Sequence, residues 1–146
     1  MAALGKGTGT HDSRRRHGRG GGNRQFDRLA ERWWDPKGPM APLHAMNPAR
    51  MGWIIARLAR RHRRDPAGAA PLAGLSVLDV GCGAGLASEA LARAGAIVTG
   101  LDAAGSALGA ARAHAAAGGL AITYREGMPE ALAAEGPASM QCWRWR

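Results

Sequence analysis

The stretch SVLDVGCGAGLASEAL, residues 76–91, constrains the fold most, because an apolar strand runs into a glycine-rich turn and then into an alanine-rich helix. Strand and helix patterns continue to alternate beyond it. We expect strands at 76–80, 97–101 and 121–124, and helices at 86–93 and 107–117. Such alternation is typical of right-handed βαβ units around a parallel sheet. The sequence therefore predicts an α/β, Rossmann-like fold, of which it supplies the first half.

The glycine spacing in the turn indicates what kind of cofactor it holds. Gly81 and Gly83 fit the first two positions of a nicotinamide or flavin fingerprint, but the third position falls on Leu86. Gly85 instead gives a tighter G-x-G-x-G turn. Without Cβ atoms in the way, the backbone of such a turn can approach a ligand closely. The alternative is an ordinary α/β turn with no ligand.

Two acidic residues flank this turn. Asp79 stands two residues before the first glycine, where a carboxylate suits a cationic ligand better than a pyrophosphate. Asp102 ends the second expected strand, where a carboxylate can accept hydrogen bonds from both hydroxyls of a ribose. S-adenosylmethionine carries an ammonium and a sulfonium group but no phosphate. It is therefore the cofactor that these residues favour.

Charge is concentrated at the two ends of the chain. The net charge is +9 over 146 residues, but residues 26–138 account for only +2 of it. A basic chain can indicate a nucleic-acid or membrane partner, and this distribution argues against nucleic acid for the central part. Cys82 and Cys142 fit neither a disulfide framework nor metal-ligand spacing. With no apolar run near the roughly 18 residues of a spanning helix, we expect a cytoplasmic protein.

Composition divides the chain into four segments: a basic, disordered head (1–25), a helical segment (26–66), a partial cofactor-binding βαβαβ region (71–138) and a tail (139–146). In the helical segment, Phe26, Leu29, Ala30 and Trp33 recur at helical spacing until Asp35-Pro36. Asn47-Pro48 predicts the start of a second helix, which Asp65-Pro66 ends. Its basic end, RLARRHRR, is either a solvated helix end or a patch for phosphate or lipid headgroups.

The sequence resembles the ubiquinone biosynthesis O-methyltransferases, which are class I S-adenosylmethionine-dependent methyltransferases. The general methyltransferase motif covers VLDVGCGAG and VTGLD, and the family-specific part is FDRLAERWWDPKGPMAPLHAMNPARMGWI, residues 26–55. The double Trp followed by Asp, then PLH and NPxR, is more diagnostic than the glycine turn. The resemblance extends to about residue 135. It implies a Rossmann-like fold with an N-terminal helical extension.

The resemblance also implies an activity and a set of residues. The activity is O-methylation of catechol hydroxyls on polyprenylated ubiquinone precursors, helped by a base or a divalent cation such as magnesium. Arg50, Gly81 and Asp102 match cofactor-contacting positions of the family. We assign structural roles to Trp33, Trp34 and His44, a helix-surface position to His114, and no role to Cys82 beyond that of a small buried side chain. The general base and any metal ligands remain unassigned.

The family pattern stops at residue 138. A fourth strand is expected there, and SMQCWRWR follows instead. A typical fourth strand, FDAVLALEV, can be encoded so that reading one nucleotide later gives SMQCWRWR and then a stop codon. We therefore expect a frameshift before Ser139, and a chain that binds cofactor weakly and turns over little. Residues 19–23 allow a similar but weaker argument, by which the basic head would also be a frameshift product. The alternative for residues 139–146 is a native variant tail.

Two other functions stay open. The Arg/Gly-rich head could bind RNA or anionic lipid in a non-catalytic protein, although it lacks the interleaved aromatic residues that stack on bases. The chain could also belong to a methyltransferase for another small molecule. For the ubiquinone-pathway function we expect a polyprenylated catechol as substrate and a peripheral association with the inner membrane.

Overall fold

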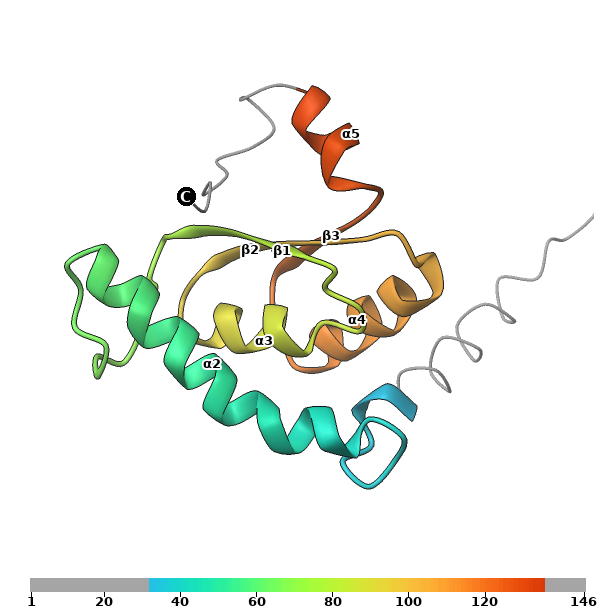
Figure 1. Ribbon diagram of the computed structural model, residues 1–146, viewed down its shortest axis with the longest axis horizontal. Coiled ribbons are helices and arrows are strands. Elements are labelled where there is room, and N and C mark those ends of the chain that lie inside the picture. The colour runs from blue at the N-terminus through green and yellow to red at the C-terminus, as the bar shows by residue number, and fades with distance from the viewer. Residues whose placement is uncertain (1–31, 136–146) are drawn as a thin grey trace, which may run out of the picture.

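The computed structural model describes residues 32–135 (Figure 1). A helical turn at 32–34 precedes seven elements in the order α2 (Ala41–Arg61), β1 (Ser76–Val80), α3 (Leu86–Arg93), β2 (Ile97–Asp102), α4 (Gly105–Ala117), β3 (Ile122–Glu126) and α5 (Pro129–Ala134). The predicted head (1–25), the predicted helix start at Phe26, Leu29 and Ala30, and the tail (139–146) lie outside the described residues. The alternation of strands and helices from β1 to β3 confirms the predicted fold class.

The three strands form a parallel sheet in the order β1-β2-β3. In Figure 1, α2, α3 and α4 lie on one side of this sheet and α5 lies on the other. Right-handed connections that step in one direction across a sheet place both crossover helices on the same face. The carboxyl ends of β1 and β2 therefore meet at one edge, next to the glycine turn that connects β1 to α3.

The helix-covered face of the sheet carries the main core. Val98 on β2 and Leu91 on α3 are buried there, and α2 adds Met51 and Ala59 to the same cluster. The turns between α2 and β1 contribute as well, because Leu72 is fully buried and its N–H donates to the carbonyl of Ala94. The opposite face leaves Ile97 62% exposed and, at the end of β1, Val80 53% exposed.

The second helix begins earlier than the sequence predicts. Asn47-Pro48 was expected at its start, but α2 begins at Ala41, so Pro48 lies inside the helix. Pro42 stands in the first turn instead, where a missing N–H has no cost. The Asn47 side chain does not cap, because its Nδ2 donates to the carbonyl of Leu86 at 3.4 Å and its Oδ1 accepts from Arg50. Contacts between elements thus override the local signal.

Other boundaries shift by one to four residues. Helix α2 ends at Arg61 rather than at Asp65-Pro66, since Arg63 adopts a left-handed φ of 54°. Strand β3 continues to Glu126, which pairs with Asp102 and so extends the ladder to the end of β2. The expected end of the first helix at Asp35-Pro36 agrees with the structure, in which 32–34 are helical and Asp35 is not.

Candidate functional site

The glycine turn between β1 and α3 needs three left-handed residues within five positions. Gly81, Gly83 and Gly85 have φ values of 73°, 53° and 88°, a region that other residues enter only at a cost. The N–H groups of Gly81 and Cys82 both donate to the carbonyl of Leu101, at 2.8 and 3.1 Å. The end of β2 therefore fixes the start of the turn.

The three glycines face different surroundings. A Cβ on Gly81 would meet no atom within 4 Å, and one on Gly83 would meet only the ring of Trp33, at 4.0 Å. A Cβ on Gly85 would collide with the hydroxyl of Tyr124 and crowd Ala111. Gly81 and Gly83 thus leave open space beside the backbone, whereas Gly85 is required by internal packing. All three were predicted to contact the cofactor, and the open cradle belongs to the first two.

Two carboxylates flank the open side of the turn, as the sequence predicts. Asp102 accepts the N–H of Gly83 with Oδ2 and the N–H of Ala104 with Oδ1, both at 2.8 Å. Asp79 accepts the hydroxyl of Ser88 with Oδ2 at 2.6 Å. Each carboxylate oxygen can accept more than one hydrogen bond, so both groups keep acceptor capacity for a ligand.

Burial makes Asp79 a weaker acid. Desolvation is the largest influence and raises the pKa of this carboxyl, and the charge of Asp102 acts in the same direction. The hydrogen bond from Ser88 and the positive charge of Arg50 oppose the rise. Arg50 is exposed on α2, where its Nη2 donates to Asn47 Oδ1 at 3.0 Å. Arg50 thus lies close enough to Asp79 for its charge to act on that carboxyl, and its cofactor role stays a prediction.

The raised pKa of Asp79 gives a pH-dependent prediction. As pH rises, the Asp79 carboxyl loses its proton at a lower pH in the unfolded chain than in the folded one. The folded state is therefore most stable at low pH with respect to this group, and it loses that stability as pH rises from the unfolded pKa through the higher folded pKa. Asp79→Asn keeps an acceptor for Ser88 and carries no charge. We expect its free energy of unfolding to exceed that of the wild type at neutral pH and to match it in acid. Thermal unfolding at pH 3, below the ordinary pKa of an Asp carboxyl, and at pH 7 measures this, and a neutral-pH loss of stability would contradict it.

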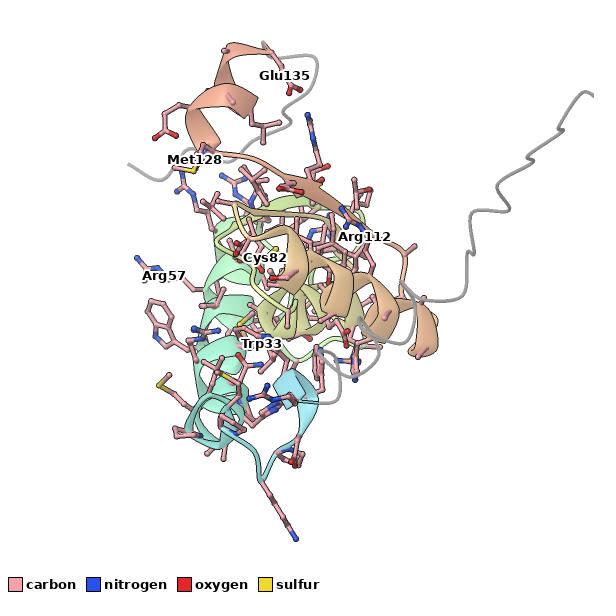
Figure 2. All side chains as sticks on the ribbon, turned by 90° about the vertical axis from the view of Figure 1, so that its right-hand side faces the viewer. Trp33, Arg57, Cys82, Arg112, Met128 and Glu135 are labelled. Carbon is pink, nitrogen blue, oxygen red and sulfur yellow. The ribbon has the colours of Figure 1, made fainter. Side chains whose placement is uncertain are left out.

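The N-terminal segment covers one side of the turn. The indole Nε1 of Trp34 donates to the carbonyl of Ala84 at 3.2 Å, and His44 Nε2 lies 2.8 Å from the carbonyl of Trp33. Figure 2 shows Trp33 next to the turn that carries Cys82. Trp33 and Trp34 pack against the buried cluster formed by Ala84 and its neighbours. These contacts agree with the structural roles expected for the motif residues.

His114 is more than the helix-surface residue that the sequence suggested, because its side chain is only 33% exposed and makes two specific contacts. Its Nδ1 lies 2.6 Å from Glu89 Oε1, and its ring stacks on Trp34 with a centroid distance of 3.5 Å and parallel planes. Glu89 is fully buried on α3 and also accepts Arg93 Nη2 at 2.6 Å. Glu89 is not among the predicted residues, and its one signal in the sequence is an acid at an otherwise apolar helix position.

Cys82 and Tyr124 complete the interior side of the turn. Cys82 is buried, as expected for a small packing residue, and burial raises the pKa of its thiol to about 12. Burial also raises the pKa of Tyr124, whose hydroxyl has no hydrogen-bond partner within 32–135. Neither group is set up as a nucleophile or base at neutral pH. Residues 32–135 also contain no cluster of three or more His, Cys, Asp or Glu that could hold a metal ion, such as the divalent cation named above as an alternative to a base.

Known proteins with similar sequences were found. Residues 77–142 match a family described as "Methyltransferase domain". The ubiquinone biosynthesis O-methyltransferase of Methylobacterium sp. (strain 4-46) is 48% identical over 112 residues, 77% of this chain and 45% of that protein. The protein of the same name from Azorhizobium caulinodans is also 48% identical over 112 residues, 77% of this chain and 44% of that protein. Among solved structures, the YcgJ protein of Bacillus subtilis gives a TM-score of 0.42 at 24% identity, covering 53% of this chain and 29% of that one.

These matches confirm the predicted resemblance. Residues 77–142 are similar to a methyltransferase domain, and the chain is similar in sequence to ubiquinone biosynthesis O-methyltransferases. It spans somewhat less than half the length of those relatives.

Proposed function

From its relationship to the ubiquinone biosynthesis O-methyltransferases, we propose that this chain binds S-adenosylmethionine at the glycine turn and serves the O-methylation of catechol hydroxyls on polyprenylated ubiquinone precursors. Relatives of this name match the chain at 48% identity. The cofactor, when bound, supplies an electrophilic methyl group. The residues described here would hold and orient it.

The open cradle at Gly81 and Gly83 carries the proposal. A Cβ on Gly81 would meet nothing within 4 Å and one on Gly83 only the edge of the Trp33 ring, and Asp79 and Asp102 lie beside the turn. A pyrophosphate placed there would be repelled by Asp79, whereas a cationic ligand is attracted and its ribose can use Asp102. We assign Asp102 to the ribose hydroxyls, the backbone of Gly81 and Gly83 to the amino-acid portion, and Arg50 to the cofactor's carboxylate. Gly85 acts indirectly, by setting the shape of the turn.

We assign the substrate-binding site and the catalytic base to the part of the relatives that this chain does not match. Val80 and Ile97 are exposed on the open face of the sheet, which is where further chain would pack in a complete domain. We accordingly propose low turnover for the 146-residue chain. We also propose that residues 139–146 arise from a frameshift. Sequencing the gene across codon 139 tests this, because restoring the frame should yield FDAVLALEV and a long continuation.

Titration calorimetry with S-adenosylhomocysteine tests the cofactor assignment. This product analogue keeps the amino acid and ribose that the cradle is proposed to hold. We expect it to bind the purified chain, and NAD, which carries a pyrophosphate, to show no binding at the same concentrations. Binding of NAD in preference to S-adenosylhomocysteine would overturn the assignment. Methyl transfer to a short-chain polyprenyl catechol, assayed on the same sample, measures the proposed low turnover.

The exposed side of α2 favours contact with an anionic membrane surface. Residues 41–64 include six Arg and no acidic residue. Trp53 is 62% exposed, and the guanidinium of Arg57 lies 5.4 Å from the centre of its ring. Trp53, Arg57, Arg60 and Arg61 follow helical spacing on one side, and Figure 2 shows Arg57 pointing outward from α2. Exposed Trp together with Arg is typical of interfacial helices. None of the helices within 32–135 is long and apolar enough to cross a bilayer.

We propose that this face holds the protein at the cytoplasmic side of the inner membrane, where a polyprenylated substrate resides. The triple substitution Arg57→Gln, Arg60→Gln and Arg61→Gln should weaken binding to phosphatidylglycerol vesicles about 100-fold, since each basic side chain near such a surface contributes about 1 kcal/mol. Vesicle co-sedimentation measures this, and neutral phosphatidylcholine vesicles are the control. The wild type and the triple variant have the same basic head, so the head cannot cause a difference between them. Equal binding by both, or a preference for RNA, would refute the proposal.

A further inference from the structure

We propose that Trp34 is a positioning residue for the cofactor: its indole N–H fixes the middle of the glycine turn, and the turn in that shape binds the cofactor. This rests on the proposed function. The hydrogen bond from Trp34 Nε1 to the Ala84 carbonyl, 3.2 Å long, joins residues 50 positions apart. Ala84 stands between Gly83 and Gly85 and is almost fully buried. No other described side chain donates to the carbonyl of a residue in 81–85, apart from the weak contact of the Cys82 thiol with Gly83.

Within the turn, the Gly85 N–H donates to the Cys82 carbonyl at 2.9 Å, and the other restraints come from outside it. Glycine has the largest conformational freedom of any residue, and ordering three of them within five positions is costly in entropy. The start of the turn is held by the Leu101 carbonyl, and Gly83 is held by Asp102. Trp34 supplies the contact at Ala84. These three supports together fix the peptide planes that line the open cradle.

The orientation of the Trp34 ring is itself fixed from the far side. The imidazole of His114 on α4 lies parallel to it at 3.5 Å, and His44 on α2 meets it edge-on at 5.9 Å. Glu89 holds His114 in place through the 2.6 Å contact with Nδ1, and Arg93 donates to the other Glu89 oxygen. Since Glu89 already accepts from Arg93, we assign the Nδ1 proton to His114. Buried Glu89 thus orients His114, and His114 orients Trp34.

A simpler role for Trp34 would be to fill space between the N-terminal segment and the domain. The two roles predict different results for Trp34→Phe. Phenylalanine keeps an aromatic ring against His114 and most of the buried apolar area, but it cannot donate a hydrogen bond to the Ala84 carbonyl. If Trp34 only fills space, Phe should alter stability alone. If it positions the turn, cofactor affinity should fall as well.

The first measurement is the Kd of S-adenosylhomocysteine, by calorimetry on the full chain. We expect Trp34→Phe to raise this Kd about fivefold, which corresponds to about 1 kcal/mol and to one lost hydrogen bond. Leu43→Ala is the matched control, because Leu43 packs against the same buried cluster and makes no hydrogen bond to the turn. It should lower Tm while leaving the Kd within about twofold of the wild type. A fivefold rise in Leu43→Ala as well would overturn the proposal.

Two variants of His114 separate its two contacts. His114→Asn keeps an N–H donor for Glu89 but removes the ring that stacks on Trp34. His114→Phe keeps a ring and leaves buried Glu89 with Arg93 as its remaining partner. We expect the Asn variant to raise the Kd severalfold and the Phe variant chiefly to lower Tm. The opposite pattern would show that the stack does not position Trp34. The His114→Asn result also serves if Trp34→Phe fails to fold.

A second readout needs no cofactor. Cys82 lies in the turn and is buried, so its rate of alkylation reports how often the turn opens. In a Cys142→Ser background, we expect Trp34→Phe to speed this alkylation about fivefold over the parent, with Leu43→Ala close to the parent. An unchanged rate in Trp34→Phe would reject the positioning role. If the wild type fails to bind S-adenosylhomocysteine, the proposed function fails, whereas the Cys82 rates still decide whether Trp34 orders the turn.

Discussion

Replacing Gly85 with alanine should lower the free energy of unfolding by about 3 kcal/mol. Two causes combine: a left-handed φ of 88° costs an L-residue about 1–2 kcal/mol, and the new Cβ would collide with buried Tyr124 and lie 3.3 Å from the Ala111 Cβ. For about 100 described residues this corresponds to a fall in Tm of more than about 10 °C. Thermal and urea unfolding of the unliganded chain measure it.

Gly119→Ala is the matched control for this effect. Gly119 has a similar left-handed φ of 66°, but a Cβ there would meet no atom within 4 Å. It should therefore show only the conformational cost, about 1 kcal/mol. The difference between the two variants isolates the packing of Tyr124 against the turn. Equal losses in both would mean that Tyr124 and Ala111 move aside, so that Gly85 is required for its φ alone.

The sequence predicts the central layers of this fold well, because their signals are local. Between β1 and β3, each apolar strand and each helix has its own periodic pattern, and the glycine turn interrupts that pattern. These signals can be recognised without knowing the rest of the fold. Even here α4 begins at Gly105, two residues before the expected start. Gly105 lies against the end of β3, since a Cβ on it would be 2.7 Å from Glu126 Oε2.

The predicted site residues are also local, and the missed ones are not. Asp79 and Asp102 are recognisable because strand ends and a glycine turn place them at one edge. His114 is read as a surface residue because its own helix gives no hint of Glu89, which lies 25 positions earlier. Asn47 looks like a helix cap for the same reason, since its true partners include the Leu86 carbonyl on another element. Contacts between residues far apart in the sequence leave no periodic pattern from which they could be predicted.

Asp102→Ala should weaken binding of S-adenosylhomocysteine by at least about 100-fold, the largest effect that we expect on the proposed cofactor site. Hydrogen bonds to a charged group contribute about 1.5–3 kcal/mol each, and the carboxylate is proposed to accept two from the ribose. Its loss also leaves the Gly83 and Ala104 N–H groups without their acceptor. Asp102→Asn retains one acceptor oxygen and should lose about tenfold. Calorimetry gives both values, and unfolding without ligand gives the accompanying loss of stability.

Asp65→Ala separates ligand binding from the local turn. Asp65 Oδ1 accepts the N–H of Ala67 at 2.9 Å, two residues on, just as Asp102 Oδ1 accepts that of Ala104 at 2.8 Å. Asp65 lies in the turns after α2 and outside the proposed cradle. Its removal should lower the free energy of unfolding by about as little as the loss of the Asp102 contact with Ala104, and it should leave the Kd unchanged. A drop in affinity confined to Asp102 variants assigns that carboxylate to the ligand. If Asp102→Asn binds as tightly as the wild type, the carboxylate only shapes the turn, and recognition of the ribose must come from elsewhere in the protein.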